Sequence, residues 1–230
     1  MSQKINPISN KLGISQIWDT TFSKYGKNFK VYNKLFYKQF KVQLYLTFLL
    51  VSKNFCLDKI TINFTNKNLF VNIFVFDIDN VNFTPKVSSL LRTNSAWLIM
   101  PIIFNFYKKL NLTNSAFLLS NYFLSLAFKE NSPKKILKNI YTVLKDQTGK
   151  FKVIYTTQGI KKVKLKGFKL QLSGCFEPSR TQMARTIQCN FGSLPLTTLN
   201  GYTEYSNSTL YTKFGSCGLK IWLFYEFKYL

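Results

Sequence analysis

The side chains in this sequence that are best placed to bind a ligand together are lysines spaced as on one face of a helix. Three of them are Lys134, Lys135 and Lys138. Ser132 and Pro133 just before them predict a helix N-terminus, and Gly149 predicts its end. At 100° per residue the lysines lie on one face and the apolar residues lie opposite. Those apolar residues are Ile136, Leu137, Ile140, Val143 and Leu144. An exposed row of ammonium groups positions phosphates but does not read bases.

A second basic stretch follows the helix. Lys162, Lys164 and Lys166 alternate with Val163 and Leu165, as in a strand, and the phase flips at Gly167, which predicts a bulge. Residues 129–169 hold twelve lysines and two acids, so their net charge is 12 − 2 = +10. We therefore predict one basic patch, made by the helix face and the adjoining strand, that a phosphate backbone could follow.

The overall charge narrows the function classes. Among 230 residues there are 32 Lys and Arg, 9 Asp and Glu and no His, which gives 32 − 9 = +23. Chemistry that needs a histidine base or ligand is excluded, and nine acids leave little for carboxylate pairs, so we expect no enzyme and no cofactor. A single lysine often has no role beyond keeping the surface hydrated. A surface with many positive and very few negative side chains, however, favours a polyanionic partner, either nucleic acid or anionic lipid.

Cysteine spacing gives no support for a metal site. The four cysteines, Cys56, Cys175, Cys189 and Cys217, are far apart in the sequence and form no CxxC pair. A structural zinc site usually needs close ligand pairs. We expect four buried free thiols and no metal.

Two nearly uncharged runs leave a membrane protein open as an alternative. Residues 93–107 and 110–128 are separated by Lys108 and Lys109, and a hydrophobic hairpin at 93–128 would suit an organelle-encoded membrane subunit. Both runs contain several polar residues, which count against spanning helices. The first residues show neither an apolar core nor an Arg-rich amphipathic pattern, so no cleavable targeting segment is expected.

The remaining periodicity indicates a mixed α+β chain. We predict a basic amphipathic helix over residues 24–44, a β-hairpin over 60–76 and a buried helix over 114–128. Strands dominate after Gly149, ending with one over residues 219–224. No glycine occurs between Gly26 and Gly149, so this part cannot contain a glycine-rich phosphate loop.

Several motifs resemble one family, the third protein of the small ribosomal subunit. At the start, QKINPISNKLGISQIW matches its Gln-Lys-x-x-Pro, Arg-Leu-Gly and Trp pattern, with Lys11 in place of the arginine. Later, KGFKLQLSG, the Ala-Arg-Thr at Arg185, LPLTTL and FGSCGLKIW follow in the family's order. Matching blocks at both ends cover about a third of the chain directly.

The resemblance implies a two-domain α+β protein in the head of the small subunit. Residues 1–112 would form an arm, the basic helix and a degenerate KH-like α/β domain. Residues 113–230 would form an α+β domain with a mostly antiparallel sheet that lines the mRNA entrance channel. The partners implied are small-subunit rRNA, mRNA and neighbouring head proteins, without a membrane or a small-molecule substrate.

The resemblance also implies roles for individual residues. The family's Arg-Arg-x-x-Lys set, associated with unwinding structured mRNA, falls in register on Lys134, Lys135 and Lys138. The expected rRNA contacts are the other basic positions in the matching and basic segments: Lys4, Lys11, Lys24, Lys27, Lys161, Lys162, Lys164, Lys166, Arg180 and Arg185. We expect the arm around Lys4 and Lys11 to order only on assembly, because it has little to pack against alone.

Departures from the family pattern point to a mitochondrial member. The Gly-x-x-Gly loop of KH domains is missing, several family arginines are replaced, and residues 150–158 look inserted. Erosion of this kind is similar to that of mitochondrial ribosomal proteins. Because a family motif begins at residue 3, synthesis inside the mitochondrion is a further hypothesis.

Overall fold

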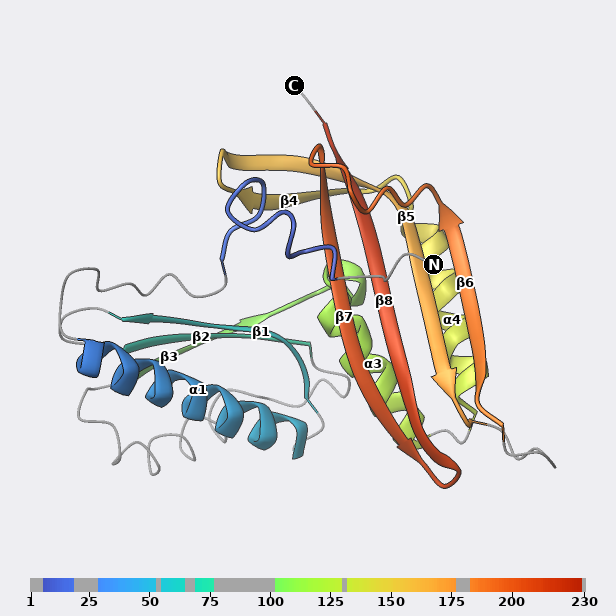
Figure 1. The fold of residues 1–230 in the computed structure, drawn as a ribbon, viewed down its shortest axis with the longest axis horizontal. Helices are drawn as coiled ribbons and strands as arrows, with labels where there is room; N and C mark the ends of the chain where they lie inside the picture. Colours follow the sequence, from blue (N-terminus) through green and yellow to red (C-terminus); the bar gives the residue numbers. More distant parts are fainter. Residues whose placement is uncertain are drawn as a thin grey trace. The chain divides into compact units, whose positions relative to one another are not determined.

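The protein is described here from a computed structural model, in which residues 6–18, 29–52, 55–64, 69–76, 102–129, 132–176 and 183–228 can be described. The chain divides into two compact units (Figure 1). One comprises Met1–Trp18 with Leu112–Leu230, and the other comprises Asp19–Asn111. The sequence-based division at residue 112 therefore needs one correction: the N-terminal arm belongs to the C-terminal unit, because Lys11 and Gln16 bond to the strand Gly201–Thr212 (β7).

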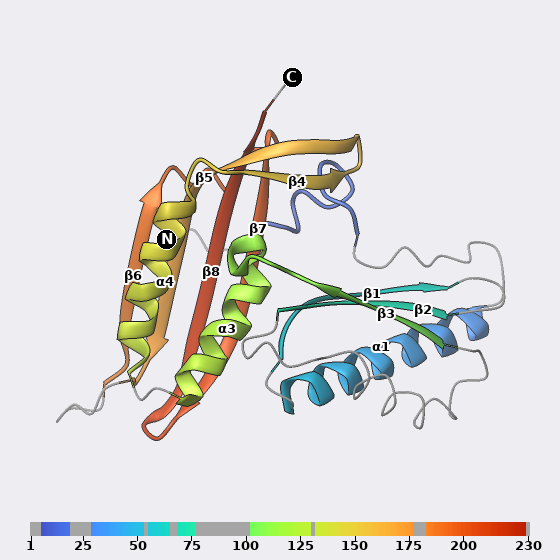
Figure 2. The same ribbon diagram turned by 180° about the vertical axis from the view of Figure 1, so that it is seen from behind.

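The larger unit is a sheet covered by two helices. Its main strands run in the order β4 (Phe151–Thr156), β5 (Gly159–Gly174), β8 (Gly215–Phe227) and β7 (Gly201–Thr212), and β6 (Arg185–Gly192) also pairs with β5. All of these pairings are antiparallel, as predicted. Helices α3 (Ala116–Lys129) and α4 (Pro133–Gln147) cover one face of the sheet (Figure 2).

The core lies between these helices and the sheet. Ile136 and Leu137 of α4 are buried against residues such as Phe168, Leu170 and Ile221. Of the five apolar α4 residues named from the sequence, four are buried, whereas Val143 is exposed. One broad hydrophobic cluster thus fixes α4 on the sheet and turns its lysine face outward.

The change in the apolar–polar alternation at Gly167 corresponds to a β-bulge inside one long strand. The β5–β8 register shifts between Leu165 and Gly167, so Leu165 and Phe168 both face the core. A Cβ at Gly167 would overlap the carbonyl oxygen of Ser193. Glycine is required because two backbones meet here. Before the bulge, β5 and β4 form a hairpin that turns away from the direction of the other strands (Figure 1).

Helix α3 is tied to the sheet at its first residue. The Ala116 amide donates to Glu204 Oε2 at 3.0 Å, and the Ser206 hydroxyl donates to the Ala116 carbonyl at 2.9 Å. The other carboxylate oxygen of Glu204 lies 2.6 Å from Lys152 Nζ. A carboxylate at a helix N-terminus also interacts favourably with the helix dipole. One β7 side chain therefore joins α3, β4 and β7.

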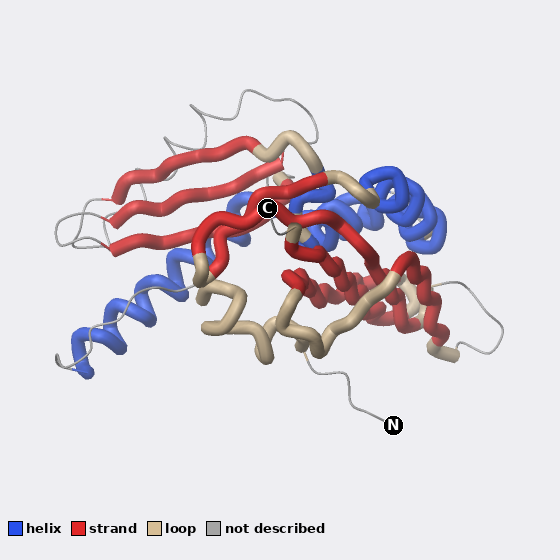
Figure 3. The backbone as a smooth tube through the Cα atoms, turned by 90° about the horizontal axis from the view of Figure 1, so that it is seen from above, coloured by secondary structure: helices blue, strands red, loops and turns tan. Residues whose placement is uncertain are grey.

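The arm packs on the sheet face opposite the helices, as the view from above shows (Figure 3). Lys11 Nζ donates to the Gly201 carbonyl at 3.0 Å, and Gln16 Nε2 donates to the Thr203 carbonyl at 2.7 Å. The Thr157 hydroxyl donates to the Ile14 carbonyl at 2.6 Å. The expectation that the arm orders only on assembly was wrong for residues 6–18, because β7 and the β4–β5 turn supply the missing partners within the same chain.

The smaller unit has one helix and a three-stranded sheet. Helix α1 (Phe29–Ser52) packs on strands β1 (Cys56–Phe64), β2 (Leu69–Phe76) and β3 (Ile102–Lys108), in the sheet order β1-β2-β3. β1 and β2 form the predicted hairpin, whereas β2 and β3 are parallel. The buried face of α1 centres on Val42, Leu46 and Leu50. The predicted helix is thus confirmed from Phe29 to Leu44 and continues to Ser52, whereas residues 24–28 of the prediction lie outside the described residues.

The membrane alternative is not favoured. Within residues 93–128, Ile102–Lys108 form strand β3, and Ala116–Lys129 form a helix that packs against the larger sheet. Among the described residues, no helix combines the length and apolar character needed to cross a bilayer. Between these two elements lies a short 3-10 turn, η2 (Leu112–Asn114).

The cysteines are all free thiols, as expected, but only two are buried. Cys56 and Cys217 are buried, whereas Cys175 and Cys189 are half-buried. The Cys217 thiol donates to the Cys175 carbonyl at 3.2 Å, and burial raises its pKa above the usual value. Within the described ranges, no three metal-ligating side chains gather.

Candidate nucleic-acid interface

The α4 lysines form an exposed basic face. Lys134, Lys135 and Lys138 are all exposed, on the side of the helix opposite buried Ile136 and Ile140. The first turn contains no acid, so Lys134 and Lys135 sit at the positive end of the helix dipole. Cations there are locally unfavourable, by roughly 0.3–1 kcal/mol each. A bound anion would remove this penalty, which makes this helix end suited to phosphate.

The local sequence explains why the helix begins where it does. Pro133 occupies the first turn, and the amides of Lys135 and Ile136 donate to the Ser132 carbonyl at 3.1 and 3.4 Å. Ser132 makes no side-chain cap hydrogen bond, so the predicted N-cap residue is right in position but not in mechanism. At the other end the helix stops at Thr148, whose backbone is extended, and Gly149 follows it with φ +91°, so the predicted C-cap glycine lies one residue beyond the cap.

Helix α4 extends over β6 as well as β5. Tyr141 meets the Phe168 ring edge-on at 5.5 Å, and Lys145 Nζ lies 5.9 Å from the centre of the Phe191 ring. Burial raises the pKa of Cys189 on β6. The charge of nearby Lys138 lowers the same pKa, but by less. The basic face of α4 thus borders β6.

The predicted single patch separates into two. Lys162, Lys164 and Lys166 are exposed on the face of β5 opposite Val163 and Leu165, whose side chains pack under the helices. Because α4 covers the apolar face of the strand, its lysines and the three β5 lysines lie on opposite sides of the sheet. Lys166 is also 2.9 Å from Glu226 Oε1. A single phosphate backbone would have to pass around the sheet edge to reach both.

The other predicted rRNA contacts differ in how exposed they are. Arg185 is exposed at the start of β6, whereas Lys161 is half-buried with its Nζ 4.9 Å from the centre of the Phe227 ring. Four of the predicted residues lie outside the described residues. They are Lys4, Lys24, Lys27 and Arg180.

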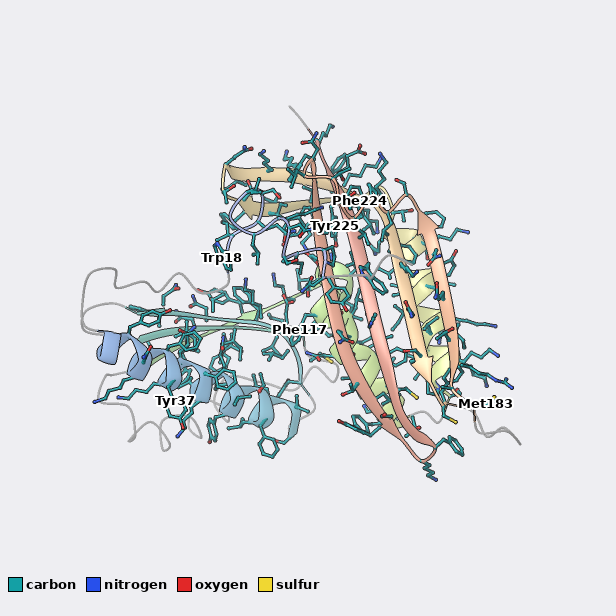
Figure 4. All side chains as sticks on the ribbon, viewed as in Figure 1. Trp18, Tyr37, Phe117, Met183, Phe224 and Tyr225 are labelled. Atoms are coloured by element: carbon teal, nitrogen blue, oxygen red, sulfur yellow. The ribbon has the colours of Figure 1, made fainter. Side chains whose placement is uncertain are left out.

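Lys11 is the clearest correction. Its side chain is 0% exposed, it donates to Gly201, and its Nζ lies 5.6 Å from the centre of the Phe224 ring, labelled in Figure 4. Burial lowers the pKa of Lys11 to about 8. A lysine held this way fastens the arm to β7 and β8 and is not available for a phosphate, so its predicted role as an rRNA contact was wrong for this conformation.

Three basic residues on the sheet face opposite the helices were missed. Lys169 Nζ lies 5.6 Å from the centre of the Trp222 ring, Lys220 is half-buried on β8, and Lys228 Nζ lies 4.9 Å from the Phe151 ring centre. Their grouping depends on the β5–β8 register, in which Gln171 pairs with Lys220. Alternation within a single strand carries no information about that register.

Comparison with known proteins places the chain in a family. It is 35% identical to the small ribosomal subunit protein uS3m of Chondrus crispus, over 98% of this chain and 94% of the relative. It is 28% identical to uS3 of Carsonella ruddii, with 97% of each covered, and 23% identical to uS3 of Pelagibacter ubique, over 97% of this chain and 90% of the relative. No family model matches.

The identity to the Chondrus crispus protein over almost the whole of both chains, together with the two further uS3 relatives, is sufficient to assign membership. It agrees with the motifs at both ends of the sequence and with the α+β fold. The chain belongs to the small ribosomal subunit protein uS3 family, in its mitochondrial form, and is a structural, non-enzymatic protein of that subunit.

Proposed function

We propose that this chain binds rRNA in the head of the mitochondrial small subunit and presents the basic face of α4 to mRNA at the entrance channel. The observation that carries the proposal is the exposed set Lys134, Lys135 and Lys138 on a helix whose other face is fixed in the core. Lysines bind phosphates without the bidentate geometry of arginine, so we propose sequence-independent contact with mRNA.

The rRNA contacts we propose come from the opposite side of the sheet. Lys166 is exposed there, Lys169 and Lys220 lie on the same face of β5 and β8, and the sheet itself separates all three from the α4 face. Arg185 of β6 is also exposed, but it lies on the α4 side of the sheet, because it shares a face of β6 with Ile187 and Cys189. Two basic surfaces facing different ways would let one protein hold rRNA with one side and touch mRNA with the other. Neutralising phosphates in this way also offsets the self-repulsion of a chain with charge +23.

For the smaller unit we propose a KH-like remnant kept for packing. Its hairpin β1–β2, its parallel strand β3 and its helix α1 support this reading. The absence of glycine from residues 27–148 rules out the Gly-x-x-Gly loop through which KH domains hold nucleic acid. Synthesis of the chain within the mitochondrion remains part of the proposal.

The test compares translation by ribosomes that carry Lys134→Ala, Lys135→Ala and Lys138→Ala with ribosomes that carry the normal chain. We expect slower elongation on messages with stable hairpins, similar rates on unstructured messages, and normal subunit assembly. The matched control removes three charges from scattered exposed positions: Lys129→Ala, Lys150→Ala and Lys213→Ala. Equal elongation of both message types by the α4 variant would contradict the mRNA role.

A further inference from the structure

The hairpin made by β4 and the first part of β5 carries an exposed apolar surface. The antiparallel register pairs Phe151 with Lys164, Val153 with Lys162, and Tyr155 with Ile160. Directly paired residues point to the same side of a sheet, so these six side chains share one face. Its four apolar members are largely exposed: Phe151 57%, Val153 56%, Tyr155 72% and Ile160 65%. We call this surface, together with Lys228, the hairpin face.

The opposite side of the hairpin is firmly held. Ile154 and Val163 are buried in the core of the unit, and Lys152 contacts Glu204 at 2.6 Å. The Thr157 hydroxyl at the turn bonds the arm at Ile14. Because these contacts fix which side faces inward, the apolar side cannot turn in to bury itself. Contiguous apolar surface of this kind on a folded protein marks an interaction site.

Charge on the hairpin face is arranged in a column beside the apolar residues. The β4 positions are all apolar, whereas β5 contributes Lys162 and Lys164, and Lys228 Nζ lies 4.9 Å from the centre of the Phe151 ring. The acid nearest in register is Glu226, opposite Lys164, and it is bonded to Lys166. The face therefore offers an apolar row flanked by positive charge.

We propose that the hairpin face docks a neighbouring protein of the small subunit, through a segment that places apolar side chains on β4 and carboxylates on the lysine column. Charge complementarity calls for acidic groups in the partner. RNA fits less well, because bases stack on aromatic rings. Here Val153 and Ile160 have no ring, and Lys228 already lies over Phe151. The proposal rests on membership of the small subunit and is independent of the mRNA role of α4. It assigns Lys162 and Lys164 to a protein partner, in place of the rRNA contact expected from the sequence.

The experiment uses native small subunits collected from a sucrose gradient, with mass spectrometry to verify that the chain is in the peak. A zero-length carbodiimide joins lysine amines to carboxylates in direct contact. We expect linked peptides between Lys162, Lys164 or Lys228 and Asp or Glu of one other protein. Hydroxyl-radical footprinting should show Phe151 and Tyr155 protected several-fold in the subunit relative to the free chain.

Distinct results overturn the proposal. A chain that sediments in the subunit with Phe151 and Tyr155 unprotected would overturn docking alone, as would protection without any carboxylate link to another protein. Ultraviolet links from Tyr155 to rRNA in place of those links would identify the surface as an RNA contact. A chain missing from the peak would overturn subunit membership together with the docking proposal.

A variant pair separates the apolar contribution from the lysines. In a tagged copy directed to the mitochondrion, Val153→Ser with Ile160→Ser should abolish most lysine–carboxylate links even though all three lysines remain. The matched control, Val143→Ser, makes the same kind of change at an exposed apolar position of α4, where Val143 is 46% exposed, and should leave the links unchanged. Undiminished links in the double variant would show that the apolar row is not part of the contact.

Discussion

Stability should rise with pH above about 8 because of one buried amine. Lys11 is 0% exposed, and burial lowers its pKa from 10.5 to about 8. Below pH 8 the folded chain holds a charged ammonium out of water, which costs free energy. Between pH 8 and 10.5 the folded chain has lost this proton, while the unfolded chain still binds it. Since the unfolded state then binds more protons, the free energy of unfolding increases with pH.

The magnitude follows from the pKa difference. About 2.5 pKa units at 1.36 kcal/mol each give an increase of about 3 kcal/mol, most of it complete by pH 10. The measurement is urea unfolding of the full chain at several pH values from 7 to 10, for the normal protein and for Lys11→Met. Methionine retains the length of the stem but has no proton to lose, so subtracting its curve removes the titration of every other group.

Two further variants serve as controls for the titration of Lys11. Lys213→Met removes an exposed lysine from the β7–β8 turn and should leave the pH dependence unchanged. Lys11→Arg, which restores the residue type of the family motif, should also flatten the rise because arginine keeps its proton in this range. Parallel curves for the normal chain and Lys11→Met would show that Lys11 is not buried as a charged group, and the account of the arm would fail.

Three further predictions concern the larger unit. Gly167→Ala should lower the free energy of unfolding by about 3 kcal/mol, measured by urea unfolding, because its Cβ would overlap the Ser193 backbone. Glu204→Gln should cost about 2 kcal/mol, since it weakens the bonds to Ala116 and Lys152; an unchanged midpoint in thermal unfolding would contradict that role. The buried Cys217 thiol, with its raised pKa, should react with iodoacetamide at pH 8 far more slowly in the folded chain than in urea, and equal rates would show that it is accessible.

Local sequence signals predicted most elements of the larger unit correctly. Pro133 and Gly149 mark the ends of α4 within two residues, and the phase flip located the bulge at Gly167. Both features depend on neighbours close in sequence. Strand β3 was not predicted, because its partner β2 is reached only across the sequence between Phe76 and Ile102, and an uncharged run alone also fits a membrane segment.

The interface was predicted less well, for a physical reason. Alternation showed that Lys162 and Lys164 share a face, but only tertiary packing shows that α4 covers the other one. The role of Lys11 depends on a carbonyl 190 positions away, for which there is no local signal. Charge counts therefore indicated a polyanionic partner, whereas the division into two surfaces required the structure.

The attachment of the arm also determines when residues 6–18 can dock during translation. Lys11 and Gln16 find their acceptors on Gly201 and Thr203, which are synthesised 190 and 187 residues after them. Until then the nascent arm has neither acceptor, and those groups stay hydrated. Residues 6–18 therefore cannot close onto β7 before β7 has been synthesised, and a truncated product that stops before residue 201 would emerge with its first segment still undocked.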